Sequence, residues 1–326
     1  MHLVTGASGF IGGRIVHALI NRGEDVRVFV RPGSNLIGLS GLTYERVDGD
    51  VTDRQSLARS AAGCGCIYHS AALYQLWSRN TAEIYRVNIE GTRNVIAAGM
   101  AAGVERIVYT SSVGTIGIPT NGLGDEDTPV SLEEMNGDYK RSKFIAEQVV
   151  FEEVRRGAPV VIVNPTFPVG AGDVKPTPSG KVITDFLKRK MPAFMDTGLN
   201  VVDVDDVACG HLLAAERGRI GQRYILGNCN MTLQEILQTL AEITNLSAPR
   251  VKLPYYPILM LAHMDAALCR LVPGRQPRIP PDGVKMARKK MFVDPSKAVH
   301  ELKMPQTPPA AALSKAVEWF YSEGYV

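Results

Sequence analysis

Residues 5–12 read Thr5-Gly6-Ala7-Ser8-Gly9-Phe10-Ile11-Gly12, between an apolar run at 3–5 and an amphipathic stretch that follows. Glycines at intervals of three let the backbone turn tightly, approach a pyrophosphate and pack a helix against a strand. The N-terminus of that helix offers free N–H groups and a positive dipole to phosphates. The pattern alone is also typical of a structural turn, but its position at a strand–helix junction favours a dinucleotide site. Its expected members are Gly6, Ser8, Gly9, Phe10, Ile11 and Gly12.

Apolar runs alternate with amphipathic stretches through the first half of the chain. The pattern over 10–22 places Ile11, Ile15 and Leu19 on one helix face and meets Gly23 as a stop signal. Strands that alternate with helices imply parallel strands joined by crossovers, so we expect an α/β fold with a Rossmann-type doubly wound parallel sheet. The expected strands are 3–5, 26–30, 44–48, 66–70, 106–110 and 160–164, with 200–204 and 223–226 as later strands of the same sheet.

Proline is distributed unevenly and suggests a second domain. Four of the 20 prolines lie before residue 165 and the others follow from Pro165 onward. Proline interrupts helix interiors and central strands, so the second half must contain shorter elements. We expect a dinucleotide-binding domain at 1–170 plus about 198–227, and a smaller mixed α/β substrate domain at about 171–197 plus 228–326. Within the latter, Thr232 and Glu235 form a capping box that opens a helix.

The composition excludes several classes of protein. The 36 basic and 33 acidic side chains give a net charge of +3, which argues against nucleic acid as a partner. The six histidines and five cysteines form no metal-ligand spacing, so we expect no metal, and scattered thiols are typical of a cytoplasmic protein. No signal peptide is visible, and no apolar run reaches the ~20 residues of a membrane span. We therefore expect membrane contact to be peripheral at most.

The end of the second expected strand bears on which dinucleotide binds. An acidic residue there bonds the ribose 2′-OH of NAD, whereas an arginine accommodates the 2′-phosphate of NADP. The sequence has Arg31 at that place, followed by Pro32 and Gly33, and no acid. We expect NADP(H), with NAD(H) possible, because Arg31 can also be a solvated surface residue.

Tyr139 and Lys143 are the candidate reactive pair. They are four residues apart in a helix pattern that starts at Asp138, so both side chains emerge on one face. A tyrosine with its ordinary pKa of ~10 is a poor base at neutral pH, and we expect Lys143 and an oxidised nicotinamide to lower that pKa. Just upstream, the strand 106–110 leads into Ser111 and Ser112, at the sheet edge where ligands of α/β proteins bind. The Ser112 hydroxyl is expected to bond a substrate oxygen.

The glycine loop, the strand-end serine and Tyr-x-x-x-Lys occur in this order along a chain of this length. The sequence in this respect resembles the extended short-chain dehydrogenase/reductases, which include nucleotide-sugar epimerases, dehydratases and dihydroflavonol-reductase-like enzymes. The resemblance covers nearly the whole chain. The stretches 109–115, 125–131, 164–170 and 173–178 resemble the bacterial hopanoid-associated sugar epimerases.

The resemblance assigns roles to individual residues. It makes Ser112, Tyr139 and Lys143 catalytic: Ser112 orients the reacting oxygen, Tyr139 exchanges its proton, and Lys143 also bonds the nicotinamide ribose. It places further residues at the cofactor: Asp50 and Val51 beside the adenine, Ala71 and Ala72 along the groove, Asn88 supporting the lysine through water, and Pro165 near the carboxamide.

The resemblance also implies a small-molecule substrate, which is a sugar, a nucleotide sugar or a lipid-linked sugar, and a possible homodimer. The leading interpretation is an epimerase of the hopanoid-associated sugar type that acts on a carbinol carbon. The alternative is an NADPH-dependent carbonyl reductase of dihydroflavonol-reductase type. Arg31 and the stretch Thr115-Ile116-Gly117, which lacks the aromatic residue of galactose epimerases, both favour the alternative.

Two stretches of the second half leave their roles open. The apolar run 258–271 is expected to be domain core, or else a pocket wall or membrane-facing patch. Between residues 275 and 290 the basic side chains Arg275, Arg278, Lys285, Arg288, Lys289 and Lys290 face Asp282 alone. A solvated basic face is the default interpretation, and a diphosphate site or contact with anionic lipid headgroups is the alternative.

Overall fold

The computed structural model describes residues 1–326 except 76, 78–79, 273–274, 276 and 278–279. Its strands are β1 (His2–Thr5), β2 (Val26–Val30), β3 (Glu45–Asp48), β4 (Cys66–His69), β5 (Arg106–Thr110), β6 (Val160–Pro165), β7 (Phe167–Val169), β8 (Ala193–Met195), β9 (Gly198–Asp203), β10 (Arg223–Leu226), β11 (Cys229–Thr232) and β12 (Val251–Leu253). Its α-helices are α1 (Phe10–Asn21), α2 (Arg54–Ala61), α3 (Ala82–Tyr85), α4 (Gly91–Ala102), α5 (Asp138–Arg155), α6 (Pro178–Leu187), α7 (Val204–Arg217), α8 (Leu233–Thr244), α9 (Tyr255–Leu271), α10 (Pro281–Met286) and α11 (Pro309–Ser322).

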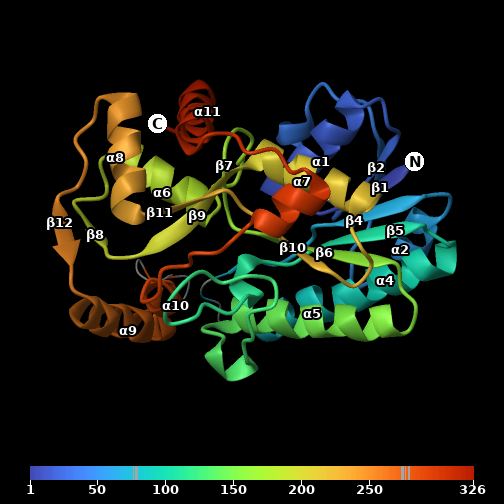
Figure 1. Ribbon diagram of the computed structural model, residues 1–326, viewed down its shortest axis with the longest axis horizontal. Coiled ribbons are helices and arrows are strands. Elements are labelled where there is room, and N and C mark those ends of the chain that lie inside the picture. Colours follow the sequence, from blue (N-terminus) through green and yellow to red (C-terminus); the bar gives the residue numbers. More distant parts are fainter. Residues whose placement is uncertain (76, 78–79, 273–274, 276, 278–279) are drawn as a thin grey trace.

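The main sheet has seven strands in the order β10-β6-β5-β4-β1-β2-β3. Every neighbouring pair is parallel. Helices α1 and α7 cover one face, and α2, α4 and α5 cover the other (Figure 1). The predicted Rossmann-type doubly wound sheet is confirmed, and the bounds of the six early strands lie within one residue of those expected.

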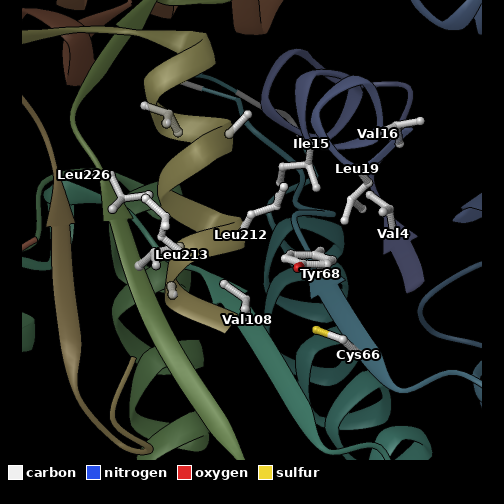
Figure 2. Packing of buried hydrophobic residues seen from close by; sticks show 14 of the residues in the cluster. Val4, Ile15, Val16, Leu19, Cys66, Tyr68, Val108, Leu212, Leu213 and Leu226 are labelled. Atoms are coloured by element: carbon white, nitrogen blue, oxygen red, sulfur yellow. The ribbon is translucent and has the colours of Figure 1, made fainter. Parts of the chain in front are cut away.

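Alternation along the strands builds one core on each face of this sheet. In β1, Val4 joins the cluster under α1 and α7, while its neighbour Leu3 joins the cluster under α2, α4 and α5. Figure 2 shows the first cluster, where Ile15 and Leu19 of α1 and Leu212 of α7 lie over the strands. Helices cover both faces of the main sheet, so its inner strands carry largely apolar side chains on both sides and are nearly continuous apolar runs in the sequence.

The rest of the chain forms two smaller sheets. One has the order β11-β9-β7, with β9 antiparallel to β11 and parallel to β7, and the other pairs β12 with β8. Helices α6, α8 and α11 bury apolar side chains such as Phe186, Leu237 and Phe320 in a third core beside the three-stranded sheet. The smaller mixed α/β part is therefore present, and the capping box of Thr232 and Glu235 opens α8 as expected.

The prediction that 200–204 extends the main sheet is wrong. This stretch is β9, whose partners are β7 and β11 of the small sheet, and only 223–226 (β10) joins the main sheet. An apolar run predicts a buried strand without specifying its partners, and the excursion through α6 and β8 brings β9 back beside β7. The domain bounds drawn from proline usage remain a proposal.

Helix α9 departs from the expectation of a buried helix. Several of its large apolar side chains are exposed, among them Tyr256, Met260 and Met264. Of the basic stretch that follows, Arg278 lies outside the described residues. No helix in the described ranges is long and apolar enough to cross a membrane.

Candidate active site

The glycine loop lies where the strand order reverses. Strand β1 is flanked by β4 on one side and β2 on the other, and ligands of doubly wound sheets bind outside the carboxyl ends of the strands at such a point. Gly6 has a φ of +76°, and a Cβ there would lie 2.5 Å from the backbone nitrogen of Ala71. A Cβ on Gly12 would press on the Gly6 carbonyl and lie 2.6 Å from Ser70 Oγ. Only glycine fits at both positions.

The N-terminus of α1 opens directly from this loop. No side chain caps the helix at Gly9, and its first turn has no acidic residue. Its N–H groups thus have no competing side-chain acceptor, and Ser8 and Gly9 are exposed beside them, whereas Phe10 is buried and Ile11 half-buried. The residues present fit a dinucleotide pyrophosphate. Sequence reasoning missed Asn35 and Val174, which line the recess next to the loop.

Arg31 and Asp50 come together at the ends of β2 and β3. Arg31 is exposed, and its positive charge acts on the Asp50 carboxylate. Burial raises the pKa of Asp50, but hydrogen bonds from Thr52 and the charges of Arg31 and Arg86 outweigh it and lower the pKa. Val51 is buried beside Gly91. These three predicted residues therefore lie just after the ends of β2 and β3.

The loop after β4 is held by two side chains. Ala71 is half-buried and its nitrogen donates to Thr5 Oγ1 over 3.4 Å, whereas Ala72 is exposed. The Asn88 amide accepts from the Leu73 nitrogen over 2.7 Å and donates to Ser142 Oγ over 2.9 Å. Asn88 therefore bridges this loop to α5 through Leu73 and Ser142.

Lys143 is buried on the inner face of α5. Its Nζ donates to the Thr110 carbonyl over 2.6 Å and lies 4.5 Å from the centre of the Tyr109 ring. Burial lowers the pKa of Lys143 to about 7, against an opposing effect of Glu147. The Lys143 amine is thus fixed at the end of β5, next to the residues that precede Ser112.

Tyr139 lies one turn earlier, half-buried at the start of α5. Its ring packs on Tyr74, with 4.2 Å between ring centres. Burial raises the pKa of Tyr139 to about 12, and the Ser112 side chain acts against that rise. The structure therefore brings Ser112 and Tyr139 together, but the side chains of this chain do not produce the lowered phenol pKa that the sequence suggested.

A buried network beneath Ser112 was missed by sequence reasoning. Asn164 Nδ2 donates to the Ser112 carbonyl over 3.1 Å and to Glu147 Oε2 over 3.0 Å. Thr115 Oγ1 also donates to Glu147 Oε2, and Arg223 pairs with Oε1 over 3.3 Å. Glu147 follows Lys143 by four residues, so the helix period could have indicated its face. The network holds the Ser112 loop against α5.

Other predicted features are at the same sheet edge. Pro165 ends β6 and is buried opposite Leu226. His69 is buried between Thr5 Oγ1 and Thr92 Oγ1, and burial lowers its pKa to about 3, as for a packing residue. In the part of the chain that the structure describes, no group of three or more His, Cys, Asp or Glu residues is placed to hold a metal ion.

Comparison with known proteins identifies the family of this chain. The model of the NAD dependent epimerase/dehydratase family matches residues 2–227. The chain belongs to this family. It is 45% identical to a putative dihydroflavonol 4-reductase of Synechocystis, over 99% of this chain and 95% of that protein. It is 37% identical to sterol demethylase protein B of Methylococcus capsulatus, over 99% of both.

The fold of this family member also matches solved structures over its full length. The crystal structure of gox2253 superposes with a TM-score of 0.89 at 40% identity, covering 100% of this chain and 99% of that one. A nucleoside-diphosphate-sugar epimerase from Pseudomonas aeruginosa gives 0.81 at 28% identity, covering 99% and 98%. The chain is an enzyme of the extended short-chain dehydrogenase/reductase class, and its family is one that uses NAD.

Proposed function

We propose that this family member is an NADP(H)-dependent oxidoreductase that interconverts a secondary alcohol and a ketone, working mainly as a carbonyl reductase. The observation that carries the proposal is the placement of Ser112, Tyr139 and Lys143 at the carboxyl end of β5 and the start of α5. The uncapped α1 N-terminus and the glycine loop lie along the same sheet edge.

The chain's own residues then have separable tasks. Tyr139 gives its phenolic proton to the carbonyl oxygen of the substrate, and in the opposite direction takes the hydroxyl proton back. Ser112 bonds the same oxygen, and the network through Asn164 and Glu147 positions it. Lys143 is held by the Thr110 carbonyl beside the space for a cofactor ribose. When bound, a nicotinamide dinucleotide supplies or accepts the hydride at the carbon that carries this oxygen.

Arg31 is the basis for proposing NADP(H) over NAD(H). Its guanidinium stands at the end of β2, where a 2′-phosphate is recognised, and Asp50 is the acidic residue whose pKa it affects. The remaining cofactor contacts are proposed for Gly6, Ser8, Gly9, Phe10, Ile11, Gly12, Asp50, Val51, Ala71, Ala72, Asn88 and Pro165. The part comprising about 171–197 and 228–326 is proposed to bind the substrate.

The name dihydroflavonol 4-reductase favours a reduction, and the name sterol demethylase protein B favours a ring-bearing, largely apolar substrate. Dihydroflavonol reductase and sterol demethylase protein B both point away from free nucleotide sugars. A second candidate is a sugar epimerase of the hopanoid-associated type. It is favoured by the four sequence stretches that resemble that group and by the likeness to the Pseudomonas epimerase.

Replacement of Tyr139 tests the reaction. Tyr139→Phe removes only the phenolic oxygen, so hydride transfer should fall by a factor of about 100 or more while NADPH binding persists. Tyr321→Phe, at an exposed tyrosine of α11, is the matched control and should leave both unchanged. Activity that survives Tyr139→Phe would overturn the proposed proton transfer.

Cofactor choice is tested at Arg31. Arg31→Ala should weaken NADPH binding much more than NADH binding, because only NADPH carries the 2′-phosphate. Arg46→Ala, on the neighbouring strand and paired with Asp48, serves as the control. Equal losses for both cofactors in a fluorescence titration would refute the assignment of Arg31.

Consumption of the reduced cofactor separates the two candidate reactions. A reductase oxidises one NADPH for each product molecule, and the absorbance of the reduced nicotinamide falls accordingly. An epimerase oxidises and reduces its substrate within one turnover, so this absorbance stays constant while product forms. Product formation with constant absorbance would reject the reductase in favour of the epimerase.

A further inference from the structure

Helix α9 presents its large apolar side chains outward and its small ones inward. Tyr256, Met260, Met264 and Leu268 recur every four residues and are 72%, 61%, 57% and 49% exposed. The residues buried on the opposite side are Ala262, Ala266 and Cys269. A surface helix normally does the reverse, with its apolar stripe toward the core. Burial within this chain therefore does not explain the composition of α9.

The outward side chains form one continuous surface at the edge of the molecule. We call it the α9 face and define it by Tyr256, Met260, Leu261, Met264 and Leu268, all exposed. Figure 1 shows α9 at the periphery, with α10 next to it on the side of the main body. A contiguous exposed apolar patch of this kind marks an interaction site.

The sequence around the α9 face is strongly basic. Residues 250–290 contain nine lysines and arginines but only two acidic residues, Asp265 and Asp282, although the whole chain is only +3. Asp265 pairs with Arg275, and Asp282 with Lys285. The Arg288 guanidinium lies 5.7 Å from the Tyr255 ring centre at the start of α9. Among the described residues, no carboxylate forms an ion pair with Arg288 or Lys289.

Apolar side chains surrounded by cations complement an anionic lipid surface. Helices with this combination lie in the membrane interface, with their apolar side at the headgroup–acyl boundary and basic residues on lipid phosphates. A second copy of the chain is a poorer occupant, because a two-fold axis would place the same basic segment on both sides of the contact. We propose that the α9 face binds the surface of an anionic membrane.

Contacts of α10 connect this surface to the candidate active site. A Cβ on Gly137, the residue before α5, would lie 2.7 Å from an Asp282 carboxylate oxygen, so α10 packs against the beginning of the helix that carries Tyr139. Lys140 Nζ lies 3.9 Å from Met291 Sδ in the segment after α10. Membrane binding through α9 thus places the site next to the bilayer, where an apolar substrate is dissolved.

Vesicle flotation with the full-length protein tests the proposal. The protein should float with vesicles of phosphatidylcholine containing about one-quarter phosphatidylglycerol, and much less with phosphatidylcholine alone. The double variant Met260→Glu/Met264→Glu should lower the partition coefficient on anionic vesicles by about tenfold or more. Arg288→Ala should lower it about fivefold. Ile220→Glu, at an exposed apolar residue away from α9, is the control and should bind as the unsubstituted chain does.

The other outcomes are equally informative. Equal flotation with both vesicle types, or an unchanged partition of the double variant, would overturn the proposal. The proposal would also be overturned if light scattering shows that the unsubstituted protein is a dimer, that the double variant is a monomer, and that neither protein binds vesicles. NADPH binding measured without vesicles confirms that each variant is folded. Turnover of a soluble ketone needs no vesicle, so measuring it separates a failure of membrane binding from a failure of the proposed reductase.

Discussion

Lys140 should destabilise the folded protein at neutral pH, and Lys140→Met should relieve that cost. The side chain is 9% exposed on α5, and its Nζ faces the sulfur of Met291. Burial, with a smaller effect from the like charge of Lys289, lowers the pKa of Lys140 from 10.5 to about 8. At about 1.36 kcal/mol per pH unit, the difference between 10.5 and about 8 corresponds to at most about 3.4 kcal/mol of unfolding free energy.

The direction in which the stability changes with pH follows from proton binding by Lys140. Between about pH 8 and pH 10.5 the unfolded chain holds the Lys140 proton and the folded chain releases it, so the stability of the unsubstituted protein rises through this window. Lys140→Met has no such proton and fits beside another methionine. We expect it to be about 1 to 3 kcal/mol more stable near pH 7, with the advantage lost by about pH 10.5.

Urea unfolding followed by the fluorescence of Trp77 and Trp319, at several pH values from about 7 to 10.5, measures this difference. Subtracting the unfolding free energies of the two proteins cancels the contributions of the other groups that titrate between these pH values. The control is Lys181→Met, at an exposed lysine paired with Asp185, whose effect should stay within about 0.5 kcal/mol at every pH. A Lys140→Met variant that is less stable near pH 7, or a difference that does not shrink with pH, would refute the reasoning.

Three further perturbations probe other parts of the structure. Gly12→Ala should abolish NADPH binding in a titration because its methyl group meets the Gly6 carbonyl and Ser70, whereas Gly13→Ala, with its nearest contact at 3.4 Å, should retain binding. Glu147→Ala should cost about 3 to 5 kcal/mol in urea unfolding, because the buried donors Asn164 and Thr115 and the half-buried Arg223 lose their carboxylate. A loss below about 1 kcal/mol would contradict this. Burial lowers the pKa of His211 from 6.5 to about 4, so its contribution to the free energy of unfolding is complete above pH 6.5. As the pH falls toward 4 the protein loses at most about 3.4 kcal/mol of this free energy. His211→Gln should lessen this pH dependence in unfolding curves measured across that range.

The sequence predicted the strands of the main sheet well, because the apolar runs and helix periods that mark them lie within short stretches of the chain. Strands β2 and β5 coincide with their expected ranges, and helix α1 runs from Phe10 to Asn21 as its apolar period indicates. Sheet membership is a long-range property, and the assignment of 200–204 failed for that reason. The orientation of α9 failed for a related reason: the sequence shows an apolar helix, but only the packing of Ala262 and Ala266 against the body reveals that the larger side chains face outward.

For the candidate site, motif spacing located the residues but not their partners. The positions of Ser112, Tyr139 and Lys143 at one sheet edge follow from a strand end and a helix period. The contacts of Asn88 with Leu73 and Ser142, and those of Glu147 with Asn164, join residues far apart in the sequence. The spacing of residues along the sequence does not predict these contacts, because they form only when the folded chain packs its loops against α5.

The protonation of Tyr139 bears on the direction of the proposed reaction. The chain's own groups raise its pKa to about 12, so at neutral pH the phenol keeps its proton. Reduction needs this form, because the phenol must give a proton to the carbonyl oxygen as hydride arrives. Oxidation needs the phenolate, and to form it near pH 7 other charges must supply about 7 kcal/mol. An epimerase has to meet both requirements in one turnover, whereas a reductase has to meet only the first, which the burial of Tyr139 already satisfies.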